Sequence, residues 1–463
     1  MIFIIRSDIV KKYLKNSLIF LSIFLISFFT IEILGFANTY GDPINSYGFS
    51  KAISMGQVPY RDFNMIVTPL YAMYQSLFLH IYDDFIMINI SQALIVTFDV
   101  ILLYKLFGKK SLLLLLVVSF FTYMNLIPTY NSLVLFFIIL LIYMENKYSD
   151  KDYLIGFILG LSVMTKQTIG CFLIIPTLII YRKEFKKILK RFVGFLVPCF
   201  IFLIYLFING ALYNFFDLCL FGIFDFASNN GVGGGHIKLV WTIISIITFL
   251  IAIIFLIKHK NDKNLYYLIC GSLFLIPICD VVYVAFWLTC FIMMFLPYIK
   301  KREKEIVRIG TCVSITFSVL CFMFWTLSLD LCVTKDINHF RYTLHREGTY
   351  KNLLIMNEYV NSFDNPIVIG YYSMLHTISN DKEFSYFSLL YDGNYGYNGT
   401  KGMIDKIKDM NNQIFIVSMI DYNSKNEFSQ FSKDIAKHIM DNYKLIDEKY
   451  GFKVYYKEWF YEI

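Results

Sequence analysis

Long apolar runs constrain this chain more than any other feature of its sequence. Between Leu18 and Leu329 they recur with lengths of about 17 to 22 residues, enough for a helix to cross the hydrocarbon core of a bilayer. Hydrophobic residues make up 57% of the 463 residues and charged residues only 17%, which excludes an ordinary soluble globular protein. The sequence therefore predicts a polytopic α-helical membrane protein.

The basic residues between these runs predict the orientation of the chain. They gather in short segments, namely Lys105 to Lys110, Arg182 to Arg191, Lys258 to Lys263 and Lys300 to Arg308. Loops rich in Lys and Arg stay in the cytoplasm, so the net charge of +7 indicates membrane topology and no nucleic-acid partner. With about eleven spans, counting an uncleaved first span at 17–37, every strongly basic loop is cytoplasmic and the C-terminal segment is extracytoplasmic.

The segment 38–84, which follows the first span, is the most polar part of the first quarter of the chain. The topology places it outside the membrane. Within it, residues 69–82 are apolar, but they are too few to span and end at the acidic pair Asp83-Asp84, which would be costly deep in lipid. We therefore expect a helix at the outer surface there, with the second span from about Phe85 to Tyr104.

Composition changes again near Thr334. Long apolar runs end, and short β-like runs alternate with helix-like segments. The expected strands are 366–370, 413–419, 443–449 and 452–457, and the expected helices are 347–361, 400–411 and 428–442. The chain is thus divided into a transmembrane domain, 1–333, and a small extracytoplasmic α/β domain, 334–463.

An ordered series of residues in the first outer segment carries a family resemblance. It consists of Asp42, the run Gly56 to Phe63 (GQVPYRDF) and the run Thr68 to Tyr71 (TPLY). The series resembles the first outer loop of the GT-C superfamily, multi-spanning glycosyltransferases that use lipid-phosphate-linked sugars. Within that superfamily it is most similar to the bacterial glycosyltransferase-39-like group, with protein mannosyltransferases and aminoarabinose transferases among the relatives.

The resemblance implies that Asp42 is the catalytic base. A carboxylate suits this role, because the acceptor hydroxyl must lose its proton as it attacks the anomeric carbon, and a single displacement inverts that centre. Many relatives carry two adjacent acidic residues here, whereas Pro43 follows Asp42. The nine cysteines lack CxxC spacing and indicate no zinc site. No cofactor is indicated, and a divalent metal is left open.

Other candidate substrate-binding residues lie at the same predicted face. Arg61 and Asp62 either order the loop or contact substrate. Lys166 and Gln167 separate two short apolar runs, and relatives often show a similar K-Q-x-x-G there, which implies a contact of Lys166 with the carrier phosphate. The alternative for Lys166 is a lysine that extends its ammonium to the membrane interface.

Two further candidates come from later segments. Asp280 stands in a Pro-x-x-Asp pattern that similar proteins share, which implies a contact with sugar or acceptor. His236 ends the glycine-rich loop 228–236, which lacks a phosphate-loop pattern and is expected to order over substrate. Residues 393–399 (GNYGYNG) form either a turn of the domain or a surface for sugar stacking.

The sequence thus favours an inverting glycosyltransferase of the cell membrane. Its donor would be a sugar on polyprenyl phosphate, and its acceptor a cell-envelope glycan, a lipid or a protein. A second reading is an O-antigen or capsule polymerase, whose large outer loops usually lie in the second half of the chain. A third is a non-enzymatic flippase or transporter, but no internal repeat is evident.

Overall fold

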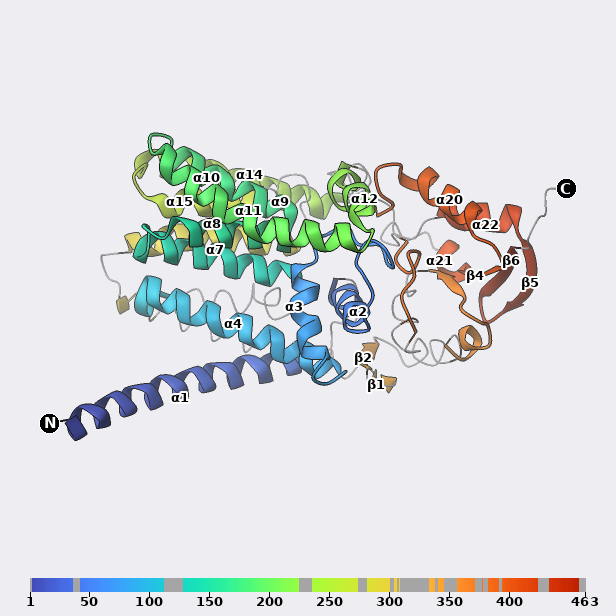
Figure 1. Cartoon of the computed structure of the whole chain (residues 1–463), viewed down its shortest axis with the longest axis horizontal. Coiled ribbons are helices and arrows are strands. Elements are labelled where there is room, and N and C mark those ends of the chain that lie inside the picture. Colours follow the sequence, from blue (N-terminus) through green and yellow to red (C-terminus); the bar gives the residue numbers. More distant parts are fainter. Residues whose placement is uncertain are drawn as a thin grey trace.

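The computed structural model consists of a long helical bundle with a smaller mixed α/β part at one end (Figure 1). It describes residues 2–35, 42–111, 128–224, 235–273, 281–299, 304–305, 308, 333–337, 340–344, 355, 357–370, 377, 382–390, 394–423 and 433–457. The predicted spans near 111–127 and 309–329 and the candidate Asp280 lie outside these residues, so the count of about eleven spans stays a prediction.

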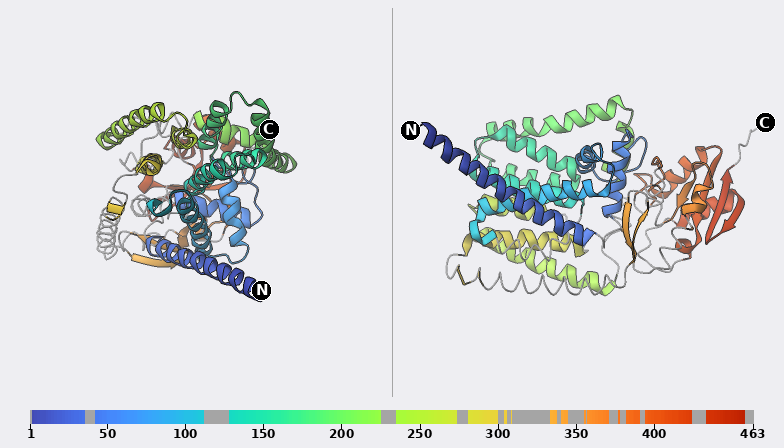
Figure 2. Two further views of the ribbon diagram at one scale, coloured as in Figure 1. Left: turned by 90° about the vertical axis from the view of Figure 1, so that its left-hand side faces the viewer. Right: turned by 90° about the horizontal axis from the view of Figure 1, so that it is seen from below.

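Four helices of the described part are long and apolar enough to cross a membrane. These stretches are Leu14–Glu32, Phe85–Lys110, Tyr130–Lys147 and Phe185–Ile208. They belong to the helices α1 (Ile2–Gly35), α4 (Phe85–Phe107), α7 (Tyr130–Lys147) and α11 (Phe185–Ile208). The other helices of the bundle are α8 (Asp152–Thr165), α9 (Gln167–Phe172), α10 (Ile174–Ile180), α14 (Gly235–Lys258), α15 (Lys263–Ser272) and α16 (Val281–Phe295). Most run side by side, whereas α1 crosses obliquely (Figure 2).

The polar first segment closes one end of the bundle. It forms α2 (Asp42–Ser54) and α3 (Leu70–Leu79), and α3 is the helix expected at 69–82. In Figure 1, α3 runs across the direction of α4. Asp84 caps α4 by accepting a hydrogen bond from the backbone N–H of Ile86 at 2.8 Å, while Asp83 pairs with buried Lys51 at 3.4 Å. The acidic pair thus fixes the junction between α2, α3 and α4.

The helices α8 and α11 approach each other unusually closely, through glycines. A Cβ at Gly156 would lie 1.9 Å from the carbonyl oxygen of Arg191, and one at Gly194 would lie 2.1 Å from that of Tyr153. Small residues at such positions let two helix backbones touch. The pair therefore forms a tightly packed unit along the bundle.

The C-terminal part is built on a four-stranded mixed sheet. Its order is β3-β4-β6-β5, with β3 (Ile367–Ile369) parallel to β4 (Gln413–Ser418), and with β5 (Lys444–Lys449) and β6 (Phe452–Lys457) as an antiparallel hairpin. The hairpin turns at Tyr450 (φ 54°) and Gly451 (φ 81°), as expected.

Helices cover one face of this sheet. Ile407 of α20 (Gly399–Asp409) and Ile439 of α22 (Lys433–Asn442) join Phe415 and Val417 of β4 in one buried cluster. The described residues also contain a hairpin that the sequence did not suggest, β1 (Val333–Ile337) with β2 (Phe340–Leu344).

Candidate functional site

The first loop between α2 and α3 is held in a defined turn by buried aromatic side chains. Tyr60 adopts φ 68°, and its hydroxyl donates to the carbonyl of Val67 at 2.7 Å. Its ring meets that of Phe215 edge to face at 5.1 Å, and Phe63 stacks on Phe49 of α2 at 5.7 Å. The GQVPYRDF motif is therefore a rigid platform beside α2.

Arg61 and Asp62 pair with each other on this platform. Arg61 donates from Nε to Oδ1 of Asp62 at 2.7 Å and from Nη2 to Oδ2 at 2.9 Å, a two-pronged contact. The backbone N–H of Val58 also donates to Asp62 at 2.7 Å. Arg61 thereby holds the pKa of the Asp62 carboxyl below its usual range, although desolvation opposes this. These contacts order the loop; a contact with substrate stays a prediction.

Gln167 joins the first loop to the rest of the bundle. Its amide nitrogen donates to the carbonyls of Ile66 at 2.8 Å and Cys219 at 3.0 Å, and its oxygen accepts from the N–H of Thr68 at 3.3 Å. The hydroxyl of Thr68 donates to the carbonyl of Val163 at 2.8 Å. Gln167 is thus a positioning residue in this structure, and it brings the break between α8 and α9 against the loop.

Lys166 lies in that break, in an extended conformation between the two helices. Its Nζ donates to Oδ1 of Asn131 at 2.9 Å and lies 4.7 Å from the centre of the Tyr130 ring. The residue is only 5% exposed. This burial disfavours the alternative in which the ammonium reaches water at the interface.

A buried polar network, which the sequence reasoning missed, includes Ser132, the residue that follows the Lys166 partner Asn131. Ser50 donates to Gln75 at 3.0 Å, Gln75 to Tyr71 at 2.7 Å, and Tyr71 and Ser132 each to the Oε1 of Gln92 at 3.0 Å. These residues belong to α2, α3, α4 and α7. Two glutamines inside apolar helical segments are the sequence signal that would have indicated it.

The three remaining candidates are not tested by side-chain geometry. Asp42 is the first residue of α2, and His236 is the second residue of α14. The side chains of both, and the whole of Asp280, lie outside the described part of the chain. Their roles stay predictions. Among the described residues, no group of three or more His, Cys, Asp or Glu side chains is placed to hold a metal ion.

The C-terminal part docks directly on the first loop. Gln57 donates to the carbonyl of Phe384 at 2.7 Å and accepts from the N–H of the same residue at 3.1 Å. Asn64, which is buried, donates to the carbonyl of Leu389 at 2.6 Å. Phe384 and Leu389 also pack into the apolar cluster around the loop. The contact is specific, because side-chain amides of the loop form hydrogen bonds with backbone groups of the segment 384–390.

The expected turn at 393–399 forms a second docking point. Asp217, on the π-helical turn η2 (Phe216–Phe221), accepts from the N–H of Tyr397 at 2.9 Å and pairs with Lys406 at 3.7 Å. Gly396 adopts φ +85°, and a Cβ there would lie 2.7 Å from the carboxylate of Asp217. Gly222 faces it, and a Cβ on Gly222 would come within 3.0 Å of the Gly396 Cα. Gly396 of this motif therefore serves docking.

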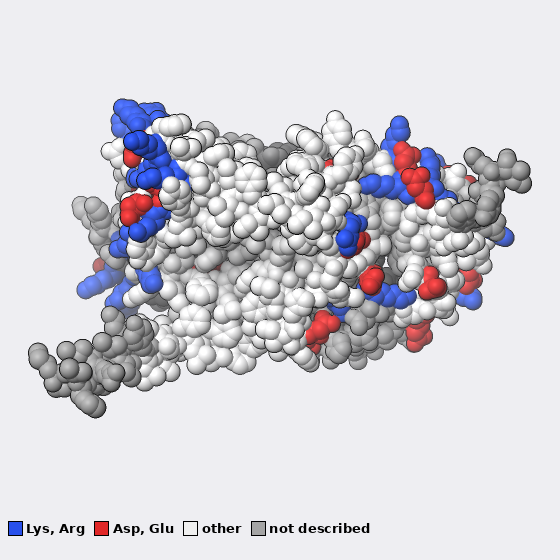
Figure 3. Space-filling view, in the orientation of Figure 1, with Lys and Arg blue, Asp and Glu red and all other residues white. Residues whose placement is uncertain are grey.

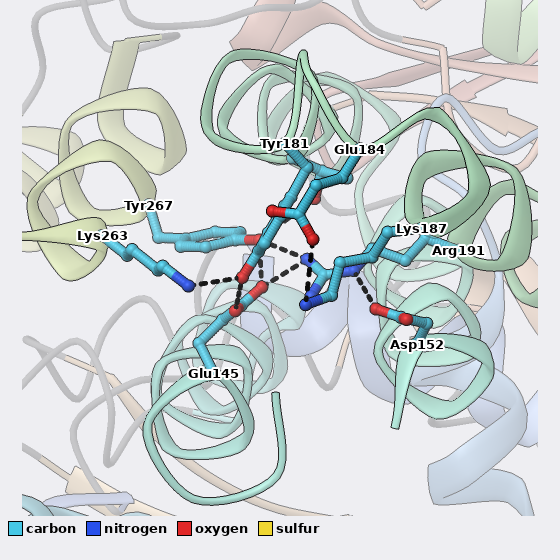
Figure 4. Close-up of polar contacts among 9 residues, drawn as sticks. Glu145, Asp152, Tyr181, Glu184, Lys187, Arg191, Lys263 and Tyr267 are labelled. Carbon is cyan, nitrogen blue, oxygen red and sulfur yellow. Dashed lines mark hydrogen bonds and ion pairs between the residues drawn. The ribbon is translucent and has the colours of Figure 1, made fainter. Parts of the chain in front are cut away.

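The opposite end of the bundle holds a buried ion cluster (Figure 4). Arg191 of α11, 1% exposed, pairs with Glu145 of α7 and donates from Nε to Asp152 of α8 at 2.9 Å. Tyr181 and Tyr267 donate to the two oxygens of Glu145 at 2.6 Å and 2.8 Å. The sequence suggested that residues 182–191 form a cytoplasmic basic loop, but Arg191 turns inward. The cluster joins five segments of the bundle, namely α7, α8, the turn after α10, α11 and α15.

Comparison with known proteins identifies the fold. No family model and no curated protein sequence matches the chain. Among solved structures, ArnT from Cupriavidus metallidurans in the apo state matches with a TM-score of 0.52 at 8% identity, over 96% of this chain and 98% of that chain. The same protein bound to undecaprenyl phosphate matches with a TM-score of 0.49 at 10% identity over the same shares. The match to the apo state shows that the chain has the fold of ArnT, a GT-C aminoarabinose transferase, as its first-loop motif implied.

Proposed function

We propose that the protein is a glycosyltransferase that moves a sugar from a polyprenyl-phosphate-linked donor to an extracytoplasmic acceptor. The observation that carries this proposal is the junction of two motif-bearing elements within an ArnT-like fold. Hydrogen bonds of Gln167 and Thr68 connect the first loop to the break between α8 and α9. Lys166 lies in that break. The same loop follows α2, the helix that begins at Asp42.

The roles follow from the chemistry of such a transfer. Asp42 takes the proton of the acceptor hydroxyl as that oxygen attacks the anomeric carbon. The lipid phosphate leaves, and the ammonium of Lys166 stabilises its charge, since Coulomb attraction is strong in a site that excludes water. The platform of Arg61 and Asp62 keeps the loop rigid, so that the two reacting groups are held in place.

Charge distribution supports an extracytoplasmic site. Figure 3 shows Lys and Arg side chains gathered at the end of the bundle far from the C-terminal part, with an uncharged band between the two ends. By the positive-inside rule this basic end faces the cytoplasm, which puts the first loop and the C-terminal part on the other side. The acceptor would then be a glycan, a lipid or a protein of the cell envelope.

Sugar transfer in isolated membranes tests the proposal. Membranes containing the full chain are given a panel of undecaprenyl-phosphate-linked sugars, and the release of undecaprenyl phosphate is measured. Asp42→Asn should abolish release, and Lys166→Gln should raise the KM for the donor. The control is Lys401→Gln, an exposed residue on α20. Full activity of the Asp42→Asn variant would overturn the assignment.

A further inference from the structure

The outward face of α11 and the turn before it combine two features, a group of cations and a row of exposed apolar side chains. The predicted membrane topology does not by itself show that they lie on the same face. The first is a set of cations without ion-pair partners in the structure. Within the described residues, Arg182, Lys183, Lys186 and Lys190 are exposed and form no salt bridge. The nearby acid Glu184 already pairs with Lys187 at 3.9 Å. This end of the helix therefore carries a concentrated positive charge.

The second feature is a row of exposed apolar side chains in line with two of these cations. At 100° per residue, Lys186 and Lys190 share one face of α11 with residues 193, 197, 201, 204 and 208. These are Val193, Val197, Ile201, Ile204 and Ile208, and they are between 44% and 74% exposed. Arg191, by contrast, points to the buried cluster on the other side of the helix.

We propose that this face is a binding site for one anionic phospholipid of the leaflet at the basic end of the bundle. The acyl chains lie along the part of the row nearest the cations, from Val193 to Ile201, which is about 12 Å of helix and fits within one leaflet of about 15 Å. The phosphate of the head group meets Lys186 and Lys190. Arg182 and Lys183 extend the positive field beyond them. The row and the two cations follow one another on one helix face, so a single lipid satisfies both at once. This site is independent of the proposed transfer reaction.

Native mass spectrometry of the full chain in detergent tests the site with defined lipids. The wild-type protein should retain phosphatidylglycerol in preference to phosphatidylcholine. The double variant Lys186→Gln/Lys190→Gln should bind phosphatidylglycerol about 30-fold more weakly, which corresponds to ~2 kcal/mol at about 1 kcal/mol for each lysine near an anionic lipid surface. The matched control is Lys401→Gln/Lys437→Gln, which removes two exposed lysines from α20 and α22.

Two further arms separate a lipid site from a general attraction to anions. Millimolar inorganic phosphate should not displace phosphatidylglycerol, because it lacks the acyl chains that contact the apolar row. The Lys186→Arg/Lys190→Arg variant should keep the preference, since it keeps the charge. Equal affinity of the wild type for both lipids, or an unchanged affinity in the double glutamine variant, would overturn the proposal, as would displacement by free phosphate.

Discussion

Replacing Arg191 by methionine is the most informative change outside the candidate site. The substitution keeps much of the side-chain length but removes the charge that Glu145 and Asp152 share. Both carboxylates are nearly inaccessible to solvent, with side-chain exposures of 0% and 8%. Two negative charges would then remain inside the bundle, close to each other and without their cation.

The size of the effect follows from the cost of buried charge. Breaking a buried ion pair by removing one partner costs about 3–5 kcal/mol, because the remaining charge is uncompensated. Tyr181 and Tyr267 still donate to Glu145 in the variant, which favours the lower part of that range. A loss of about 3 kcal/mol lowers the folding equilibrium constant by roughly two orders of magnitude.

Thermal unfolding of the detergent-solubilised protein, followed by size-exclusion chromatography after heating, measures this loss. Lys190→Met is the matched control, since it changes the neighbouring residue on the exposed side and should leave the unfolding temperature unchanged. The triple variant Arg191→Met/Glu145→Gln/Asp152→Asn should recover most of the stability, because no charge is left buried. If Arg191→Met unfolds at the wild-type temperature, the cluster does not stabilise the bundle as argued.

Two shorter predictions concern the first loop and its docking. Gly396→Ala places a Cβ against the Asp217 carboxylate at a left-handed φ, so we expect docking to weaken by at least about 1–2 kcal/mol and limited proteolysis near the turn to speed up. Asp62→Asn removes a carboxylate whose pKa is lowered by Arg61. The ionised carboxylate stabilises the folded state at pH values above the ordinary aspartate pKa, and this stabilisation is lost as pH falls through the lowered pKa. The gap in unfolding temperature between wild type and Asp62→Asn should therefore be widest near neutral pH and close in acid; a gap that is the same at all pH values contradicts this assignment.

The sequence predicts single membrane-spanning helices well, because the hydropathy of one segment indicates directly whether it is stable in the hydrocarbon core. The helix α4 begins at Phe85 and ends at Phe107, near the expected span from about Phe85 to Tyr104, and the hairpin at Tyr450 is set by its own two turn residues. The helix α11 instead begins at Phe185, inside the basic segment that was expected to be a loop. Contacts between segments that are distant in the chain could not be predicted in this way. Gln57 lies 327 residues from Phe384, and nothing local in either segment specifies their hydrogen bonds.

The inward turn of Arg191 shows the same limit at the scale of one residue. In the run from Arg182 it looks like its basic neighbours, and only its position on the helix separates it from Lys190. An α-helix turns by 100° at each residue, so adjacent basic residues face different surroundings. One meets Glu145 and Asp152 and becomes part of the core, while the other faces outward. Periodicity within a charged segment therefore carries information that a count of charges discards.

The pair α8–α11 connects the two ends of the molecule. At one end of α8, Asp152 holds Arg191; at the other, the helix gives way to Lys166 and Gln167, which meet the first loop. The 14 residues between these points form about 21 Å of helix. At Gly156 the backbone of α8 approaches that of α11 closely, and the two helices pack tightly along this length. The ion cluster and the candidate site therefore share one rigid support, and the position of Lys166 depends on how firmly the far end of that support is anchored.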